Sequence, residues 1–307
     1  MAKDYKPLDL LSKEQIEEIR EKRDWINVVS IFFNWLQIIA AMGFFFFFPN
    51  ALTFLISVVV IGSRQFALAV LAHDGAHNLL FSDVRINDFA SQWFCDFPIF
   101  LDNRPYRPYH LAHHRFTESE EDPDLSLSAP FPITKASFRR KVFRDLTGLT
   151  GFRRYSITLK SIFSSKADDL TGKIKKITDK ISGFLITNLV IFTVISIFLH
   201  WSIYFLLWWI PAFTYYSLIV RIRNIAEHSV TPGDTNLNNT RTTKASSLLR
   251  YLMVPHHVNY HLEHHLFTIC PWYNLPKVHE MLKEHSYSDQ MCIENSYFAV
   301  LKKATSR

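Results

Sequence analysis

The sequence has little cysteine and little glycine. Its 307 residues include eight glycines and three cysteines, Cys95, Cys270 and Cys292, which lie far apart and form no Cys-X-X-Cys pair. This spacing excludes a disulfide scaffold and a cysteine-based zinc site, and it fits a reducing compartment. The glycine content also excludes collagen-like chains. Because 48% of the residues are hydrophobic, a disordered chain is excluded as well.

Acidic residues are outnumbered by basic ones. The chain carries 34 Lys and Arg against 28 Asp and Glu, which gives a formal net charge of +6. A basic chain favours an anionic partner, either nucleic acid or a membrane surface. We expect no nucleic-acid partner, because no recognised nucleic-acid-binding motif accompanies the charge.

Charge is almost absent from four long stretches of the chain. These stretches are residues 25–48, 51–72, 183–199 and 201–220. About 18 apolar residues suffice to cross a bilayer, and buried helices of soluble proteins rarely run so long without charge. The sequence therefore predicts an all-α integral membrane protein whose four spans form two hairpins. Residues 89–101 are apolar but too short to span, so we place them in the membrane interface.

The distribution of Lys and Arg predicts the orientation. Residues 1–24 carry six of them and residues 78–182 carry 17, whereas the two short turns between paired spans carry none. The positive-inside tendency places both termini and the long loop in the cytoplasm, at a bacterial inner membrane or the endoplasmic reticulum. Within the loop, residues 135–180 hold 13 basic residues against four Asp, which suits contact with anionic headgroups or an ordinary solvated loop.

The predicted domain organisation follows from these stretches. Residues 1–24 form a cytoplasmic N-terminal segment, in which Ser12 and Gln15 have the spacing of a capping box that opens a helix. Residues 25–280 form the membrane domain, and residues 281–307 form a cytoplasmic tail.

One charge, Arg64, falls within a span; we expect it to contact a substrate headgroup, to pair with an acidic neighbour or to extend to the interface.

Histidine is abundant, and eight of the 14 histidines fall into three clusters. The clusters are His73 with His77, His110 with His113 and His114, and His261 with His264 and His265. Helical positions i, i+3 and i+4 share one face, so each cluster can present two or three imidazoles to a common point. Imidazole is the commonest metal ligand. The clusters therefore predict a catalytic metal site on the cytoplasmic side, against the alternative of ordinary surface or core histidines.

Further residues near the clusters are candidates for the same site. His228, at i+4 from Asn224 after the last span, is a possible ninth ligand, and Asn224 would then contact a metal through water. Metal-bound imidazoles usually donate their second N–H to a carboxylate. The candidates for that role lie beside the proposed ligands and are Asp74, Asp122, Asp124, Glu227 and Glu263. His256 and His257 are left unassigned, and His200, His279 and His285 are expected at the surface.

The number of imidazoles indicates the metal. Eight exceed what one ion needs, so a two-metal site is expected. Zinc sites usually close with four ligands, often including Cys or carboxylate, whereas a large imidazole set beside a membrane favours redox-active iron. Unactivated C–H bonds of lipid chains can be attacked only with such an oxygen-activating centre.

The motifs HDGAH, HLAHH and HLEHH resemble those of the membrane fatty acid desaturases, whose pattern is HxxxH, HxxHH and HxxHH. Arg64-Gln65, Asp122-Pro123-Asp124, residues 223–228 and Asn259-Tyr260 extend the resemblance over roughly residues 51–280. Thr268 departs from it, since relatives often have Pro there.

The resemblance implies an O2-dependent desaturase that introduces a double bond into a fatty acyl chain. It implies four membrane helices beneath a cytoplasmic helical cap, and two Fe ions with Asn224 acting through water. The implied iron ligands are His73, His77, His110, His113, His114, His228, His261, His264 and His265. No HPGG motif occurs, so we expect a separate ferredoxin or cytochrome b5-type electron donor.

Three alternatives stay open at this point. A hydroxylase or ketolase of lipids, carotenoids or alkanes would share the fold and the metal. A membrane zinc hydrolase is suggested by the likeness of HDGAH to HExxH, although Asp stands where the catalytic Glu belongs. A metal-binding or transport protein without catalysis would instead have ionisable residues spread through its spans.

Overall fold

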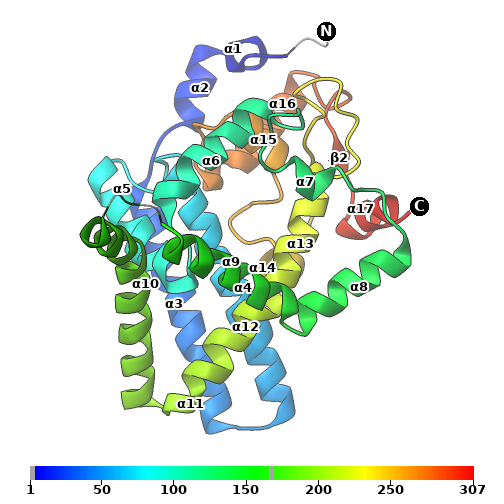
Figure 1. Ribbon diagram of the computed structural model, residues 1–307. Helices are drawn as coiled ribbons and strands as arrows, with labels where there is room; N and C mark the ends of the chain where they lie inside the picture. The colour runs from blue at the N-terminus through cyan, green and yellow to red at the C-terminus, as the bar shows by residue number, and fades with distance from the viewer. Residues whose placement is uncertain (1–3, 166, 168) are drawn as a thin grey trace.

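The structure of the protein is a computed structural model, and it describes residues 4–165, 167 and 169–307. Two long helical hairpins form the lower part of the molecule (Figure 1). The first pairs α3 (Asp24–Phe47) with α4 (Ala51–Ala76). Pro49 and Asn50 form the turn, and the Asn50 side chain accepts the backbone N–H groups of residues 52 and 53 at 3.0 Å. This cap starts α4 directly after the turn.

The second hairpin pairs one continuous helix with a segmented one. Its first arm is α10 (Leu170–Phe198). The second arm consists of α11 (Trp201–Tyr204), the π-helical turn η3 (Phe205–Trp209), α12 (Ile210–Phe213) and α13 (Tyr215–His228). Both arms, like α3 and α4, are long and apolar enough to cross a membrane. The prediction of a multi-pass, all-helical membrane protein with four spans is therefore confirmed.

The helices run beyond the apolar stretches that predicted them. α4 continues to Ala76, α10 begins at Leu170 instead of residue 183, and the last span continues to His228. An apolar run marks only the part of a helix that lies in lipid, and a polar continuation can extend it into the headgroups and beyond. As a result α4 and α13 carry His73 and His228 out of the spans on rigid helices.

α4 lies at the centre of the membrane part. The apolar part of α4 is 67% buried within the protein, whereas that of the first span is 22% buried and that of α10 is 28% buried. Ile61, Leu68 and Leu71 of α4 are fully buried, and Leu207 and Ile219 of the segmented arm belong to the same core. The outward-facing apolar side chains of α3 and α10 are left for lipid.

The cap above the spans is built from short helices. The segments are α1 (Pro7–Leu10), α2 (Lys13–Ile19), α5 (Val84–Ala90), α6 (Asn103–Phe116), α7 (Leu125–Ser128), α14 (Ser247–Leu252), α15 (His261–Leu266), the 3-10 turn η4 (Trp272–Asn274), α16 (Leu275–Glu284) and α17 (Tyr297–Ala304). Two short strands, β1 (Thr242–Thr243) and β2 (Ile293–Glu294), pair in parallel. The expected capping box is confirmed, because Ser12 accepts the Gln15 N–H and Gln15 accepts the Ser12 N–H.

Residues 89–101 form a compact helical turn at the edge of the cap. They contain the π-helical η1 (Ser91–Asp96) and the 3-10 turn η2 (Phe97–Ile99). Cys95 is fully buried, whereas Phe89 and Phe94 are exposed. The segment thus packs one side against the protein and presents aromatic rings on the other.

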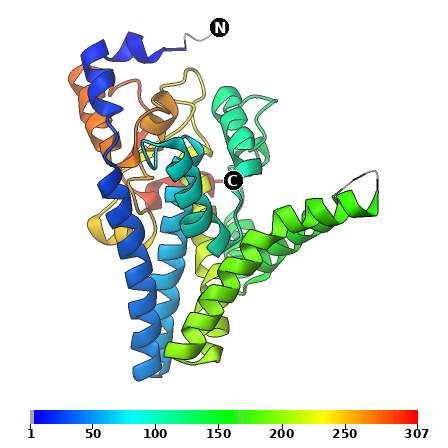
Figure 2. The same cartoon turned by 90° about the vertical axis from the view of Figure 1, so that its left-hand side faces the viewer.

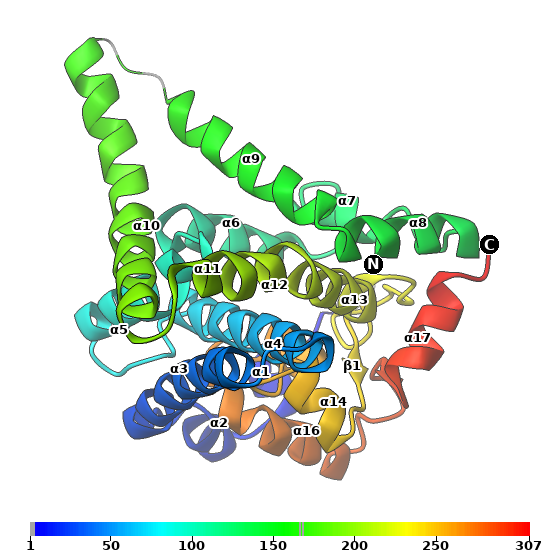
Figure 3. The same cartoon turned by 90° about the horizontal axis from the view of Figure 1, so that it is seen from below.

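The basic region after α7 forms α8 (Lys135–Leu146) and α9 (Leu149–Phe163). α9 runs outward from α8 toward the start of α10 (Figure 3), and α10 leans away from α3 and α4 (Figure 2). Exposed Phe143 and Phe152 alternate with basic side chains along these helices. Lys3, Lys166 and Asp168, three of the charges considered above, lie outside the described residues.

Candidate metal centre

The structure brings the nine predicted histidines together in two adjoining groups. Group 1 consists of His73, His77, His110, His114 and His264, and group 2 consists of His113, His228, His261 and His265. Within each group the candidate ligand atoms lie within 4.8 Å of one another. They come from the upper ends of α4 and α13 and from the cap helices α6 and α15.

Each HxxHH cluster is divided between the two groups. In α6 the i, i+4 pair His110 and His114 belongs to group 1, while His113 belongs to group 2. In α15 the assignment is reversed: His261 and His265 belong to group 2, while His264 belongs to group 1. Positions i and i+4 are about 40° apart around a helix, and position i+3 lies on the other side of position i. α6 and α15 therefore each serve both groups.

The end of α4 is fixed against α6 through backbone carbonyls. The Arg107 guanidinium donates from Nε to the Ala76 oxygen at 2.9 Å and from Nη2 to the Gly75 oxygen at 3.0 Å. Gly75 also lies close to η1, because a Cβ atom there would come within 2.3 Å of Ser91 Oγ. The close approach requires glycine, and it sets the position of the helix end that carries His73 and His77.

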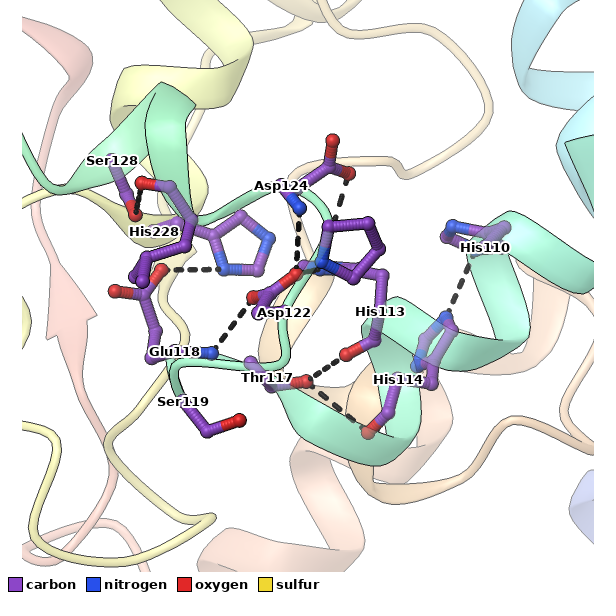
Figure 4. Close-up of polar contacts among 12 residues, drawn as sticks. His110, His113, His114, Thr117, Glu118, Ser119, Asp122, Asp124, Ser128 and His228 are labelled. Atoms are coloured by element: carbon purple, nitrogen blue, oxygen red, sulfur yellow. Dashed lines mark hydrogen bonds and ion pairs between the residues drawn. The ribbon is translucent and has the colours of Figure 1, made fainter.

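His113 is oriented by Asp122, one of the predicted carboxylates. Its Nδ1 lies 2.8 Å from Asp122 Oδ1, and both groups are buried (Figure 4). Asp122 also accepts the backbone N–H groups of Glu118 and Asp124, each at 2.8 Å. A carboxylate at Nδ1 assigns the proton to that nitrogen and leaves Nε2 of His113 to face group 2.

The other predicted carboxylates lie at varied distances from the groups. Asp74 is 3.5 Å from His73 Nδ1 and accepts the Trp272 backbone N–H at 2.9 Å. Asp124 is 3.9 Å from His113 Nδ1 and accepts the Tyr109 hydroxyl at 2.5 Å.

Glu227 and Glu118 lie on the side of group 2. Glu227 is 3.6 Å from His261 Nε2 and forms an ion pair of 2.6 Å with Arg223. Glu118, which the sequence did not single out, lies 3.6 Å from His228 Nδ1 (Figure 4). Glu118 reaches His228 because the chain after α6 folds back over α13, a contact between distant segments that the sequence does not indicate.

Glu263 and His279 make a contact that the sequence did not indicate. Glu263 is fully buried; its carboxylate lies 2.5 Å from His279 Nδ1 and accepts the Thr242 hydroxyl. The expectation that His279 lies at the surface is wrong, since it is only 7% exposed. The signal was present in the sequence, because His279 is at i+4 from Leu275 and thus on the buried face of α16.

Asn224 and Arg64 are placed differently with respect to the groups. Asn224 lines a small cavity of about 40 Å³ beside group 2, together with Tyr106, Leu127 and His228. Arg64 lies nine residues before His73 on α4, away from both groups, and is buried.

The imidazole nitrogens have the arrangement that a bound cation needs. His110 and His264 each place Nε2 3.0 Å from His114 Nε2, and in group 2 the Nε2 atoms of His228 and His261 are 2.8 Å apart. The Nε2 atoms of His73, His77 and His265 are buried, with no hydrogen-bond partner among the described residues. One proton can serve only one such pair of nitrogens, whereas a metal ion accepts lone pairs from all of them. The residues present therefore fit a metal site with two positions.

Burial keeps these imidazoles in the form that binds metals. It lowers the pKa of His77 to about 4 and the pKa of His114 to about 2, with neighbouring cationic groups adding to the effect. Burial and the surrounding histidines also hold the pKa values of His110, His261, His264 and His265 well below 6.5. The neutral ring has a free lone pair, so the groups are ready to coordinate at neutral pH.

The fold and the site together define a multi-pass membrane protein with a histidine-rich candidate metal centre at the upper ends of its spans. The model of the fatty acid desaturase family matches residues 49–292, and the chain belongs to this family. It is accordingly an oxidoreductase, and the resemblance seen in the three histidine motifs is confirmed.

Two curated relatives share the family. The chain is 27% identical to a dihydrorhizobitoxine desaturase of Bradyrhizobium elkanii over 240 residues, which cover 74% of this chain and 66% of that protein. It is 24% identical to the Delta(5) fatty acid desaturase fat-4 of Caenorhabditis elegans over 278 residues, which cover 81% of this chain and 61% of the relative. The matched region thus spans slightly less than two thirds of each relative.

Proposed function

We propose that the protein introduces a double bond into the acyl chain of a lipid. Two Fe ions would be held by the nine histidines of groups 1 and 2, with Asn224 contacting one of them through water. The observation that carries this proposal is the convergence of nine imidazoles, each buried or half-buried, at the upper ends of apolar spans in a desaturase-family chain. Bound iron would supply the oxygen activation that no side chain can provide.

The electrons of the proposed reaction balance with one external donor. O2 takes up four electrons and four protons to give two molecules of water. Two electrons and two protons come from the adjacent C–H groups of the substrate, and two electrons come from a ferredoxin or a cytochrome b5-type protein, with two protons from solvent. The basic cap would suit an acidic donor.

The chain's own residues would position the reactants and exclude water. Asp122 holds His113 in one tautomer, and the Arg223–Glu227 ion pair lies beside Asn224 in the wall of the cavity next to group 2. Tyr106 and Leu127 close the same cavity. The helices that carry or adjoin the histidines support the fixed geometry that C–H abstraction needs.

We infer that both termini and the cap face the cytoplasm, at a bacterial inner membrane or the endoplasmic reticulum. The excess of Lys and Arg in residues 1–24 and 78–182 supports this orientation, as does its absence from the short turns at the opposite end of the spans.

Product analysis tests the proposed function. Cells that express the protein should contain a new unsaturated lipid by mass spectrometry, and purified protein should contain about two irons per chain. His264→Ala should abolish the product while the protein stays in the membrane fraction, because it removes a ligand of group 1. His285→Ala, at an exposed histidine, is the matched control and should retain the product.

Two results would contradict the proposal. Hydroxylated or oxo products instead of alkenes would assign the protein to the hydroxylases or ketolases that share this centre. Zinc as the sole metal of active protein would reject the oxygen-dependent reaction.

A further inference from the structure

A second cavity lies outside the two histidine groups, between α4 and α14. It has a volume of about 300 Å³ and is lined by Arg64, Ser247, Arg250, Val254, Pro255, His256 and His257. Figure 3 shows α14 beside α4 on the side away from α10. The lining combines two arginines, two imidazoles and a hydroxyl, and it includes no carboxylate.

Arg64 is buried in this wall without a counter-charge. It is 6% exposed, and among the described residues its contacts are with neutral groups: Asn34 Oδ1 at 3.5 Å, Ser63 Oγ at 2.8 Å and the Tyr251 carbonyl oxygen. Its guanidinium also lies 4.6 Å from the centre of the Tyr251 ring. Nε of Arg64 is buried and has no hydrogen-bond partner in the part of the chain that the structure describes.

The neighbouring span shows what a paired arginine looks like in this protein. On α13, Arg221 contacts Asp145, and Arg223 contacts Glu227. A buried guanidinium without an anion is costly, because burial removes its hydration. An anion in the cavity would offset that cost at Arg64, as Asp145 and Glu227 do for the two arginines of α13.

The two histidines of the cavity are neutral and lie on an unusual stretch of backbone. His256 and His257 both have left-handed backbone conformations, with φ of 52° and 53°, which non-glycine residues seldom adopt. Nε2 of His256 faces the Asn34 amide at 3.1 Å. Burial together with the Arg64 charge lowers the pKa of His256 to about 3, so the positive charge of the cavity comes from the arginines.

The cavity is connected to the metal centre through His256 and Trp272. His256 also borders a small void lined by His73, His261 and His264. The His256 ring packs 4.6 Å from the Trp272 ring, and the Trp272 backbone N–H binds Asp74 beside His73. His256 thus lies between the Arg64 cavity and the void beside the two groups.

We propose that this cavity binds an anionic head, a carboxylate or a phosphate, of a molecule whose apolar part lies along the spans. Arg64 would contact it from the cavity wall with its guanidinium, and the half-buried Arg250 would contact it from the cavity mouth. The anion would come either from the substrate or from a phospholipid of the bilayer. The inference rests on the cavity and does not require the proposed desaturation.

Binding of three single-chain probes tests the proposal. Metal-loaded protein in a non-ionic detergent is titrated with laurate, dodecyl phosphate and uncharged dodecanol, and Kd is obtained from the ligand-dependent shift of Tm. We expect laurate or dodecyl phosphate to bind at least tenfold more tightly than dodecanol. Arg64→Gln should remove this preference, and Arg250→Gln should reduce it severalfold.

Arg153→Gln is the matched control, because Arg153 is an exposed arginine of α9 outside the cavity and should leave the preference unchanged. Arg250 is partly exposed, so Arg250→Gln remains informative if Arg64→Gln does not fold. Equal binding of all three probes by the unmodified protein would overturn the proposal. So would an anion preference that survives both Arg64→Gln and Arg250→Gln.

The source of the anion is read from two further measurements. If it belongs to the substrate, Arg64→Gln raises KM by at least tenfold and leaves kcat within about twofold. If it belongs to a lipid, Arg64→Gln loses an anionic phospholipid that co-purifies with the unmodified protein, and KM stays unchanged. Protein that shows the anion preference but forms no unsaturated product would contradict only the proposed function.

Discussion

At the scale of single residues, the candidate centre depends on which nitrogen of each imidazole carries the proton. His113 shows this most clearly, because buried Asp122 accepts from its Nδ1 and is itself held by two backbone N–H groups. His265 has a similar arrangement, with Thr117 Oγ1 at 3.2 Å from Nδ1 and with Nε2 unpartnered within residues 4–165, 167 and 169–307. At His113 and His265, the side chains that contact Nδ1 therefore leave Nε2 to face the candidate centre.

We predict that Asp122→Asn lowers iron occupancy and turnover by about 10- to 100-fold, the usual effect of losing a carboxylate behind a metal-bound imidazole. The amide keeps nearly the same volume, but it lacks the charge that stabilises the Nδ1–H tautomer of His113. Iron per chain and the rate of product formation measure the effect. Glu120→Gln changes a nearby exposed carboxylate and should leave both values unaltered. An unchanged iron content in Asp122→Asn would show that Asp122 has no part in orienting the ligand.

At the scale of elements, the end of α4 is the critical support of group 1. It carries two of the five histidines, it packs against η1 at Gly75, and Arg107 binds its last carbonyls. α6 and α15 then approach from the cap and close both groups. A small displacement of the α4 end would therefore move His73 and His77 away from the ligands on the other helices.

We predict that Gly75→Ala destabilises the protein by about 1–3 kcal/mol, the usual cost of overpacking a close contact. The added Cβ would lie 2.3 Å from Ser91 Oγ and 2.6 Å from Ser91 Cβ, so α4 and η1 would have to separate. The thermal midpoint in detergent and the iron content should both fall. Gly43→Ala is the control, because no atom lies within 4 Å of a Cβ at that helical position. Equal midpoints for the two variants would mean that the Gly75 contact relaxes without cost.

At the scale of the whole molecule, the centre connects the membrane part to the cap. Its nine histidines come from two spans and two cap helices, and α1, α2, α15 and α16 of the cap pack around a separate apolar cluster that includes Ile19, Leu262 and Leu282. A metal that binds all four helices stabilises only the folded arrangement, since an unfolded chain does not hold its ligands together.

We predict that removing the metal with a chelator lowers the thermal midpoint of the purified protein. A ligand at 1,000 times its Kd stabilises a protein by about 4 kcal/mol, which sets the size of the effect. The midpoint should recover when ferrous iron is added back without oxygen. His264→Ala should show little response to either treatment. A chelator-treated protein that lacks metal yet unfolds at the original midpoint would contradict the role of the centre in joining the helices.

The sequence alone predicted the four spans and the nine histidines that are candidate metal ligands. Charge-free runs of this length have few stable places other than a bilayer, and i, i+3, i+4 spacing places imidazoles on one side of any helix. Tertiary packing decided how those imidazoles are shared, because the rotation of α6 and α15 against each other sends His113 and His264 to opposite groups from their neighbours. It also decided the roles of Glu118 and His279, and it brought Arg64 together with His256 and His257 across the cavity. Local spacing fixes which side chains share a face, but contacts between distant segments depend on how the helices pack.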